Sequence, residues 1–453
     1  MGNLLASLRG SADTLETLQR ALSVVQNNVT NAATPGYARQ RLGLEAKRFE
    51  LDSGLPGGVN STGLINSRTD FLENAVRVQA ERFGKFSRQA AQLAQIEPVF
   101  DISEGAGIAG ALNGLFQSFS HLSISPNDIP ARETVIRGAE TLAQSFNFTA
   151  TSLARISANS DSQIQSTVAE INRLAARLRD FNLELRRDFR ARNDAGLDAQ
   201  IHATLEELSD LVDFTVLHQS DGSMTILAGG QTTLVIGDRT LPISADFAGT
   251  TAAILDSQGQ DITGQIRQGA LNGLLDIRNN FLPSVLTELN TLAQSVADRV
   301  NLTLAAGLDL NGVPPTINLF TYNVANGAAF TLAVTAIQPA DLAAALPGAP
   351  GGNGNALALA ALPNAPQIGG FTFSEYLGGI GARIGRALRT ATDDEQTQSQ
   401  LLAQARTLRA EASAVSMDEE AAVLVQFQRN YQAAAEMFRV LNEMTEEMIG
   451  LLR

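Results

Sequence analysis

Residues 4–37 read LLASLRGSADTLETLQRALSVVQNNVTNAATPGY, and this stretch decides how the first end of the chain folds. Its apolar residues recur every seven positions in two interleaved series. The first series is Leu8, Leu15, Leu22 and Val29, and the second is Leu4, Leu18 and Val25. Such a stripe is typical of a coiled-coil helix. Because asparagines weaken the pattern after Val25 and Thr34-Pro35-Gly36 stops it, the sequence predicts one helix that ends at a tight turn.

The last stretch of the chain repeats this pattern. One seven-residue series runs through Met417, Leu424, Tyr431 and Phe438, and another through Phe427, Ala434, Leu441 and Met448. Residues 1–48 hold six basic and three acidic side chains, a balance of +3. Residues 417–453 hold seven acidic side chains and three arginines, a balance of −4. Because opposite charges favour association, we expect the two ends to pair as a coiled coil.

Between the ends, the sequence indicates more helices and one small sheet. Apolar stripes at helical spacing lie within residues 72–93, 164–185, 282–300 and 376–412. Alternating patterns lie within residues 212–216, 224–228 and 232–236, separated by Asp221-Gly222 and Gly229-Gly230. The predicted fold is mainly α with a small β insert, as an elongated multi-domain helical bundle with paired terminal helices and an antiparallel β outer domain. The expected domains are residues 1–34 with 416–453 (terminal helices), 35–205 with 269–306 and 356–415 (middle helical domain), and 206–268 with 307–355 (β-rich outer domain and linker).

The composition excludes several classes of protein. The net charge of −14 argues against a surface that binds nucleic acid or anionic lipid. Cysteine is absent, which excludes disulfides, thiolate zinc sites and a cysteine nucleophile. No apolar run approaches the roughly 18 residues of a spanning helix, and residues 1–19 lack the apolar core of a secretory signal peptide. We therefore expect no nucleic acid partner, no membrane insertion and no export by the general secretory route.

Four motifs resemble chemical sites, and each has a simpler interpretation. Residues 105–110, GAGIAG, have dinucleotide-loop spacing, but the preceding segment reads as the end of a helix and not as a strand. The histidines, at 121, 202 and 218, have no partner at metal-ligand spacing. Residues 309–312 resemble half of a calcium loop, without its closing glutamate. Seven arginines between 173 and 192 are interspersed with acids and are not accompanied by an aromatic stacking platform, which favours a solvated or subunit-facing helix surface. We assign no catalytic, cofactor-binding or metal-binding residue and no cofactor.

The stretch QNNVTNAATPGYARQ, residues 26–40, resembles the N-terminal signature shared by flagellar rod, hook and hook-associated proteins. Two further blocks narrow the resemblance to the hook-associated protein 1 family: GNALALA at 354–360 with FSEY at 373–376, and SMDEE at 416–420 with FQRNYQAAA at 427–435. GALNGLLDIR at 269–278 and GLDLNG at 307–312 are similar to its middle region.

This resemblance implies a structural subunit, and not an enzyme, that forms the junction between flagellar hook and filament. The implied partners are further copies of the chain in a ring or helical oligomer, the hook protein, a second hook-associated junction protein, and a cytoplasmic export chaperone at the C-terminal helix. The family also implies type III export to the extracellular flagellum. The predicted assembly interface is Leu8, Leu15, Leu18, Leu22, Val25, Asn27, Asn28, Asn31, Pro35, Gly36, Tyr37, Leu424, Phe427, Tyr431, Phe438, Leu441 and Met448.

Three alternatives remain open from the sequence. A hook or rod protein would share the first signature but not the GNALALA block. A nucleotide-dependent enzyme would depend on the glycine loop at 105–110. A secreted coiled-coil effector would form no ordered polymer on purified hooks.

Overall fold

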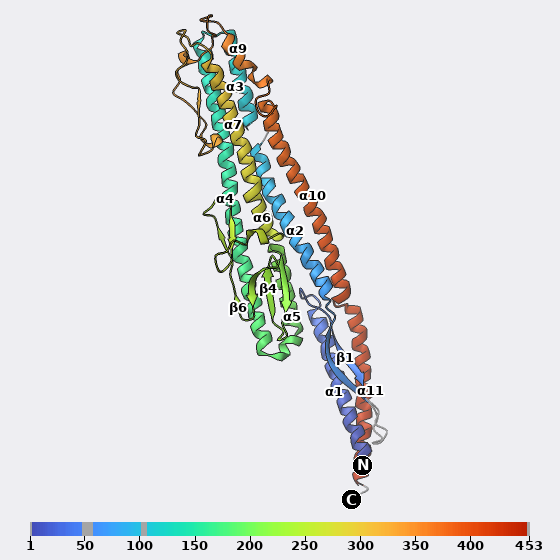
Figure 1. The fold of residues 1–453 in the computed structure, drawn as a ribbon. Coiled ribbons are helices and arrows are strands. Elements are labelled where there is room, and N and C mark those ends of the chain that lie inside the picture. The colour runs from blue at the N-terminus through green and yellow to red at the C-terminus, as the bar shows by residue number, and fades with distance from the viewer. Residues whose placement is uncertain (1, 48–57, 101–106, 451–453) are drawn as a thin grey trace. The chain divides into compact units, whose positions relative to one another are not determined.

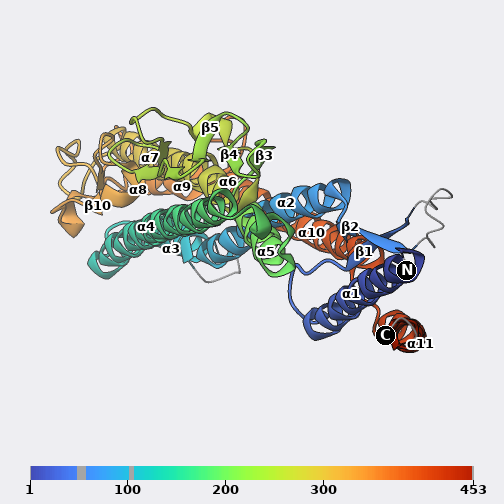
Figure 2. The ribbon, with the colours of Figure 1, turned by 90° about the horizontal axis from the view of Figure 1, so that it is seen from below.

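The computed structural model describes residues 2–47, 58–100 and 107–450 of the chain. The elements gather into two compact units (Figures 1 and 2). Unit 1 comprises Met1–Arg82, Ile171–Pro242 and Gln398–Arg453, and unit 2 comprises Phe83–Glu170 and Ile243–Thr397. These boundaries differ from the three-domain division expected from the sequence, and that division stays a prediction.

Unit 1 holds both ends of the chain and most of the β structure. Its elements are α1 (Gly2–Asn31), β1 (Gln40–Ala46), β2 (Val59–Asn66), the start of α2 (Asp70–Ile96), the end of α4 (Ile129–Arg187), η2 (Phe189–Asn193), α5 (Ala195–Leu211), β3 (Phe214–His218), β4 (Met224–Ala228), β5 (Thr232–Ile236), β6 (Arg239–Thr240), the end of α10 (Phe373–Ser413) and α11 (Met417–Gly450). The predicted terminal helices α1 and α11 pack along each other, as expected from their stripes.

The predicted sheet is confirmed as the antiparallel order β3-β4-β5-β6. Asn182 of α4 binds this sheet because its amide donates to the Met224 carbonyl at 2.7 Å and accepts from the Met224 N–H at 2.8 Å. The hairpin of β1 and β2, by contrast, falls in a region that the sequence assigned to a helical domain. Its strands alternate weakly, since most positions of β2 are exposed, and so they lack the apolar face that marks a strand.

Unit 2 is a helical bundle with short β pairs. Its elements are the end of α2, η1 (Glu97–Phe100), α3 (Gly107–Ile124), the start of α4, β7 (Ser244–Asp246), β8 (Ala253–Leu255), η3 (Thr263–Gln265), α6 (Gly269–Asp276), η4 (Ile277–Phe281), α7 (Leu282–Ala305), β9 (Phe320–Thr321), α8 (Ala328–Thr331), β10 (Ala333–Val334), η5 (Pro339–Asp341), α9 (Gly354–Ala361), η6 (Leu362–Asn364) and the start of α10. The core is apolar and aromatic, and Phe116 stacks on Phe373 with ring centroids 5.9 Å apart. The stripes predicted at 282–300 and 376–412 are the buried faces of α7 and α10.

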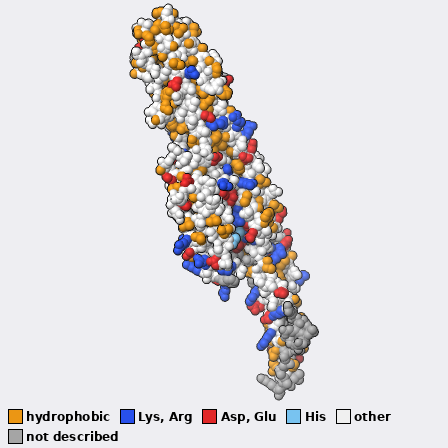
Figure 3. All heavy atoms as spheres, in the orientation of Figure 1, with side chains coloured by type: hydrophobic (Ala, Val, Ile, Leu, Met, Phe, Trp, Pro, Cys, Tyr) orange, Lys and Arg blue, Asp and Glu red, His pale blue; other side chains and the backbone are white. Residues whose placement is uncertain are grey.

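The stretch 307–372 of unit 2 carries only two charged side chains, Asp309 and Asp341. Both accept hydrogen bonds from nearby backbone N–H groups, at Val313 and Gln338 respectively. Hydrophobic side chains gather over the end of unit 2 that carries α9 (Figure 3). Charged residues are therefore sparse in this stretch of a strongly acidic chain, and both of them take part in local hydrogen bonds.

Candidate functional site

The paired terminal helices form a site whose apolar stripe is only partly buried. On α1, Leu18 and Val25 are buried, with 6% and 4% of their surface exposed, but Leu8, Leu15 and Leu22 are half-buried. All the predicted α11 positions are half-buried, namely Leu424, Phe427, Tyr431, Phe438, Leu441 and Met448. Other apolar side chains of α11 are well exposed, among them Met437 at 62% and Met444 at 50%. A helix pair alone therefore leaves much of its apolar surface in water.

Asn28 joins three separate segments at one end of this pair. Its side chain is 1% exposed, and all its hydrogen-bonding groups are used. The amide nitrogen donates to the Gln40 carbonyl at 2.8 Å and to Glu420 at 3.1 Å. The amide oxygen accepts from the Gln40 N–H and from the Tyr37 hydroxyl, both at 3.0 Å. One buried amide thus holds α1, β1 and the start of α11 together, and its satisfied groups give this contact a single geometry.

A buried ion pair completes this contact. Arg39 lies 2.6 Å from Glu420, through Nε and Oε1, and 2.6 Å from Glu419, through Nη1 and Oε2. The Arg39 and Glu420 side chains are 10% and 1% exposed, whereas Glu419 is 64% exposed. Burial, and then the charge of Glu420, raise the pKa of Tyr37 to about 12, so the phenol stays a donor to Asn28 at neutral pH. We call Asn28, Tyr37, Arg39, Gln40 and Glu420 the terminal latch.

The turn between α1 and β1 is bound closely to α5. Gly36 has a φ of +75°, a conformation that favours glycine. A Cβ at this position would lie 2.6 Å from the Ala199 carbonyl oxygen of α5, which excludes any side chain. Pro35 and Asn27 are exposed, and Asn31 donates to the Asn27 carbonyl at 3.0 Å within α1. The structure thus places Gly36, Tyr37 and Asn28 in contacts, while Asn27 and Pro35 face solvent.

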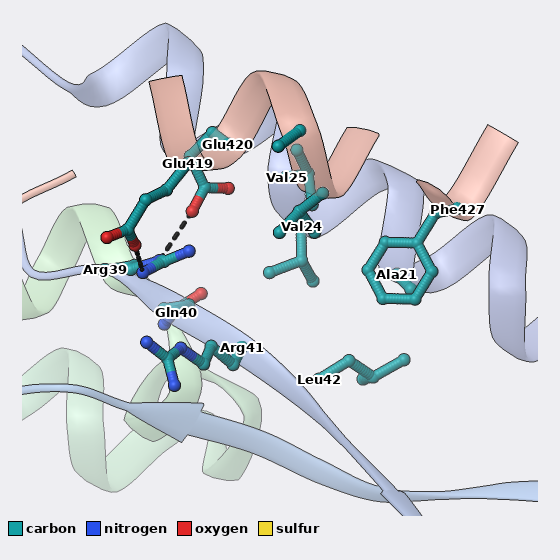
Figure 4. Close-up of a pocket in the computed structure, with 12 residues that line it drawn as sticks. Ala21, Val24, Val25, Arg39, Gln40, Arg41, Leu42, Glu419, Glu420 and Phe427 are labelled. Atoms are coloured by element: carbon teal, nitrogen blue, oxygen red, sulfur yellow. Dashed lines mark hydrogen bonds and ion pairs between the residues drawn. The ribbon is translucent and has the colours of Figure 1, made fainter. Parts of the chain in front are cut away.

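Two hollows lie along the helix pair. The larger, of about 470 Å³, opens between α1, β1 and α11 (Figure 4). Its floor is apolar, with Val25, Leu42 and Phe427, and its rim carries Arg39, Arg41 and Glu419. The second, of about 290 Å³, lies between residues 7–14 of α1 and residues 434–441 of α11. Hollows with apolar floors show that α1 and α11 do not close a core by themselves.

Three latch residues were not among the predicted site residues: Arg39, Gln40 and Glu420. Arg39 also donates its backbone N–H to the Ser413 carbonyl at 2.8 Å, which binds β1 to the end of α10. The signal that pointed to them was the opposite charge of the two chain ends. That signal predicts that the ends attract but does not select one carboxylate from the run at 418–420.

The motifs that resemble chemical sites are ordinary structure where the chain is described. Residues 105 and 106 of the glycine loop lie outside the described residues, Gly107 begins α3, and the preceding described elements are α2 and η1. His121 and His202 lie in α3 and α5, and His218 ends β3. Asp309 accepts from the N–H groups of Asn311 and Val313 in a turn.

Metal-binding groups and membrane-spanning helices are both absent from the part of the chain that the structure describes. Over residues 2–47, 58–100 and 107–450, no group of three His, Cys, Asp or Glu side chains is arranged to hold a metal ion. None of the helices within those ranges is both long and apolar enough to cross a membrane.

The run of arginines at 173–192 contains ion pairs with nearby acids. Arg179 pairs with Asp180 at 2.6 Å, and Arg186 lies 3.3 Å from Asp221.

Comparison with known proteins gives concordant results. A family model described as the flagellar hook-associated protein FlgK helical domain matches residues 93–320, half of the chain. A second, described as the flagellar basal body rod FlgEFG protein C-terminal domain, matches residues 407–451. Flagellar hook-associated protein 1 of Bacillus subtilis is 27% identical over 96% of this chain and 96% of its own length. That of Salmonella typhimurium is 27% identical over 66% of this chain, and the match spans only 56% of the Salmonella protein.

The solved structure of the flagellar hook junction protein FlgK from Burkholderia pseudomallei has the same fold. Its TM-score is 0.68 at 16% identity, over 76% of this chain and all of that one. Paired terminal helices and a middle helical bundle therefore define a structural protein of the flagellar axial class. Within that class, the chain belongs to the flagellar hook-associated protein FlgK family. It is a structural hook-associated junction protein of the bacterial flagellum, and the hook-protein, rod-protein and enzyme alternatives are not favoured.

Proposed function

We propose that the chain assembles through α1 and α11 to form the junction between hook and filament. The observation that supports this is the half-buried apolar stripe of a helix pair that the buried Asn28 amide joins at one end. The latch fixes the two helices against each other, and the remaining stripe and hollows offer apolar surface to neighbours. The apolar residues of the predicted interface on α1 and α11 belong to this stripe.

The proposed partners are other copies of this chain, the hook protein and a second hook-associated junction protein. Surfaces of this kind bury apolar area only when a neighbour covers them, so assembly and final ordering of the helices are one event. Before export, Phe427, Tyr431, Phe438 and Leu441 would offer an amphipathic helix to a chaperone groove. We further propose type III export to the extracellular flagellum, because the family is flagellar.

We also propose that the chain has no enzymatic activity. The support is chemical: the described histidines are separate, and the residues beside the glycine loop do not form a nucleotide-binding unit. Incubation with NAD or ATP should leave the melting temperature unchanged. A shift that disappears in a Gly107→Ala variant would overturn this proposal.

Assembly is tested in a strain that lacks the chain. Electron microscopy should show hooks without filaments, and the wild-type chain should restore the filaments. Leu424→Asp places a charge in the stripe and should block assembly while the rest of the chain stays folded. Leu217→Asp, the same change at an exposed residue of β3, should assemble normally. Normal filaments with Leu424→Asp would contradict the proposal.

A further inference from the structure

Arg68, between β2 and α2, is a buried charged residue that contacts the turn between α1 and β1. Its side chain is 7% exposed. The Nη2 group donates to the Gly36 carbonyl at 2.6 Å and to Asp198 at 2.7 Å, and Nε also donates to Asp198, at 2.9 Å. The Nη1 group pairs with Glu73 of α2. One guanidinium therefore connects the turn, α2 and α5.

A second layer of charges surrounds this contact. His202 lies 3.7 Å from both Glu73 and Asp198. Arg409 of α10 lies 3.2 Å from Glu73 and 2.7 Å from Glu206. Burial acts to raise the pKa of Glu73, but His202, Arg68 and Arg409 outweigh it and lower the pKa to about 2. Glu73 therefore stays ionised and holds Arg68 in place at neutral pH.

The backbone of the turn matches this arrangement. Gly36 approaches Ala199 of α5 closely enough that even a Cβ would collide with the carbonyl oxygen. Asp198, the residue that receives two Arg68 donors, precedes Ala199 directly. The same short segment of α5 thus packs closely against the turn and, through Asp198, binds the Arg68 side chain that holds the turn.

We propose that Arg68 is a positioning residue of the assembly site, which fixes the Gly36 turn on α5 and so sets where β1 and the terminal latch begin. Tyr37, Arg39 and Gln40 follow Gly36 directly, and three of the five latch residues therefore depend on the place of this turn. The inference rests on the proposed function for its biological meaning, but its geometry concerns unit 1 alone. Lysine cannot replace Arg68, because one ammonium cannot hold a carbonyl and two carboxylates in a fixed plane.

The test is hydrogen exchange on the free full-length chain, followed in peptides that cover residues 34–39. The Arg39 N–H, bonded to Ser413, and the Tyr37 N–H, bonded to Thr34, report whether the turn is docked. We expect protection in the wild type and exchange at least about tenfold faster in Arg68→Met and Arg68→Lys. Arg406→Met, which removes a neighbouring arginine whose side chain is 51% exposed, should exchange like the wild type.

Gly36→Ala makes the result independent of the charges. It keeps every charged member of the ion network, but it blocks the approach to Ala199 and strains the backbone at a φ of +75°, so it should release residues 34–39 as Arg68→Met does. If Arg68→Met also removes protection from β3 to β5, unit 1 as a whole has unfolded, and Gly36→Ala decides the question. Unprotected residues 34–39 in the wild type, unchanged exchange in Gly36→Ala, or full protection in Arg68→Lys would each overturn the proposal.

The result of this exchange experiment can be distinguished from the result of the assembly experiment that tests the proposed function. The exchange experiment uses no hook and no other protein. Assembly of the Leu424→Asp variant would refute the proposed function while leaving the exchange result intact. Conversely, a null result for Arg68 would leave assembly through α1 and α11 untouched.

Discussion

The side-chain amide of Asn28 donates a hydrogen bond to the carboxylate of Glu420 across 3.1 Å, although 392 positions separate the two residues in the chain. The same amide accepts from and donates to the backbone of Gln40. Asn28 therefore recognises the C-terminal helix and the first strand together. Because Asn28 and Gln40 are both buried, removal of the Asn28 amide would leave the Gln40 backbone groups without a partner and shielded from water.

We predict that Asn28→Ala weakens assembly on hooks at least about tenfold. The change leaves the Gln40 backbone groups, the Tyr37 hydroxyl and one Glu420 oxygen without this partner, at a cost of roughly 1–3 kcal/mol. The amount of variant retained on purified hooks, as a function of its concentration, measures the effect. Asn27→Ala is the matched control, since the Asn27 amide is exposed, accepts from Asn31 at 2.8 Å within α1 and makes a 3.4 Å contact to the Tyr37 hydroxyl, but does not bond to β1 or α11. Equal retention of the two variants would contradict the role given to Asn28.

We predict that the effects of substituting Arg39 and Glu420 on assembly are strongly coupled. Arg39→Met alone leaves Glu420 buried without its cation, which typically costs about 3–5 kcal/mol. The double variant Arg39→Met with Glu420→Met removes both charges and should recover much of the assembly that the single variant loses. Retention on hooks of the two single variants and the double variant gives the coupling. A double variant as weak as the sum of its parts would show that the pair is not coupled.

The helices and the small sheet could be predicted because their signals are local. The seven-residue stripes of α1 and α11 lie within the helices that they specify, and the turns at Asp221-Gly222 and Gly229-Gly230 lie directly between the strands that they connect. The hairpin of β1 and β2 could not be predicted in this way. Its strands pair with each other while one face stays in solvent, and the alternation that marks a half-buried strand is absent.

The contacts of the terminal latch could not be predicted from local sequence patterns. Asp418, Glu419 and Glu420 all occupy the first turn of α11, where acids favour the helix dipole whatever else they contact. Only the meeting of the two chain ends buries Glu420 and leaves Glu419 in solvent. Arg68 and Asp198 likewise come together across 130 positions, and no spacing rule connects them.

Arg132 is a buried charged residue that stabilises unit 2 and takes no part in the terminal latch. Its side chain donates to three backbone carbonyls, those of Pro126, Pro339 and Leu342, at 2.8, 3.1 and 2.6 Å. Burial lowers the pKa of Arg132. We predict that Arg132→Leu destabilises the contact of the α3–α4 turn with residues 339–342 by about 2–4 kcal/mol, since three carbonyls lose their donor.

Hydrogen exchange in peptides from residues 126–132 and 338–343 measures the Arg132 effect. Arg137→Leu, a change on the exposed face of the same helix, is the control, because the Arg137 side chain is 63% exposed. Peptides from α11 should be unchanged in both variants. Exchange in Arg132→Leu that matches the control would refute this role.

The raised pKa of Glu81 predicts how the stability of unit 1 depends on pH. Burial, and then the charge of Asp213, raise the pKa of Glu81 from 4.5 to about 8. Between pH 4.5 and 8, the folded chain therefore keeps a proton that the unfolded chain releases. The contribution of Glu81 to stability must fall as pH rises through this window.

We predict that Glu81→Gln removes this loss and stabilises unit 1 at pH 8 by roughly 1–4 kcal/mol. The free energy of opening, from hydrogen exchange in β3 to β5 at pH 5 and pH 8, should fall with pH in the wild type and change less in the variant. Glu207→Gln, at an exposed position of α5, should behave like the wild type. A wild-type opening energy that rises from pH 5 to pH 8 by the same amount in both chains would contradict the assignment.

We predict, finally, that α1 and α11 are largely disordered in the free chain and order on assembly. Ordering costs conformational entropy at every residue of both helices, and the apolar stripe repays it only where its side chains are covered. In the pair alone, Leu8, Leu15 and all the predicted α11 positions stay half-exposed, while Met437 and Met444 lie in solvent. A neighbouring subunit that covers them adds buried surface without adding chain to be ordered. Hydrogen exchange of the dilute free chain should therefore be fast in Leu4 to Val29 and in Leu424 to Gly450, and should slow on hooks. Strong protection throughout both segments in dilute solution would show that the helix pair is stable by itself and that assembly only captures it.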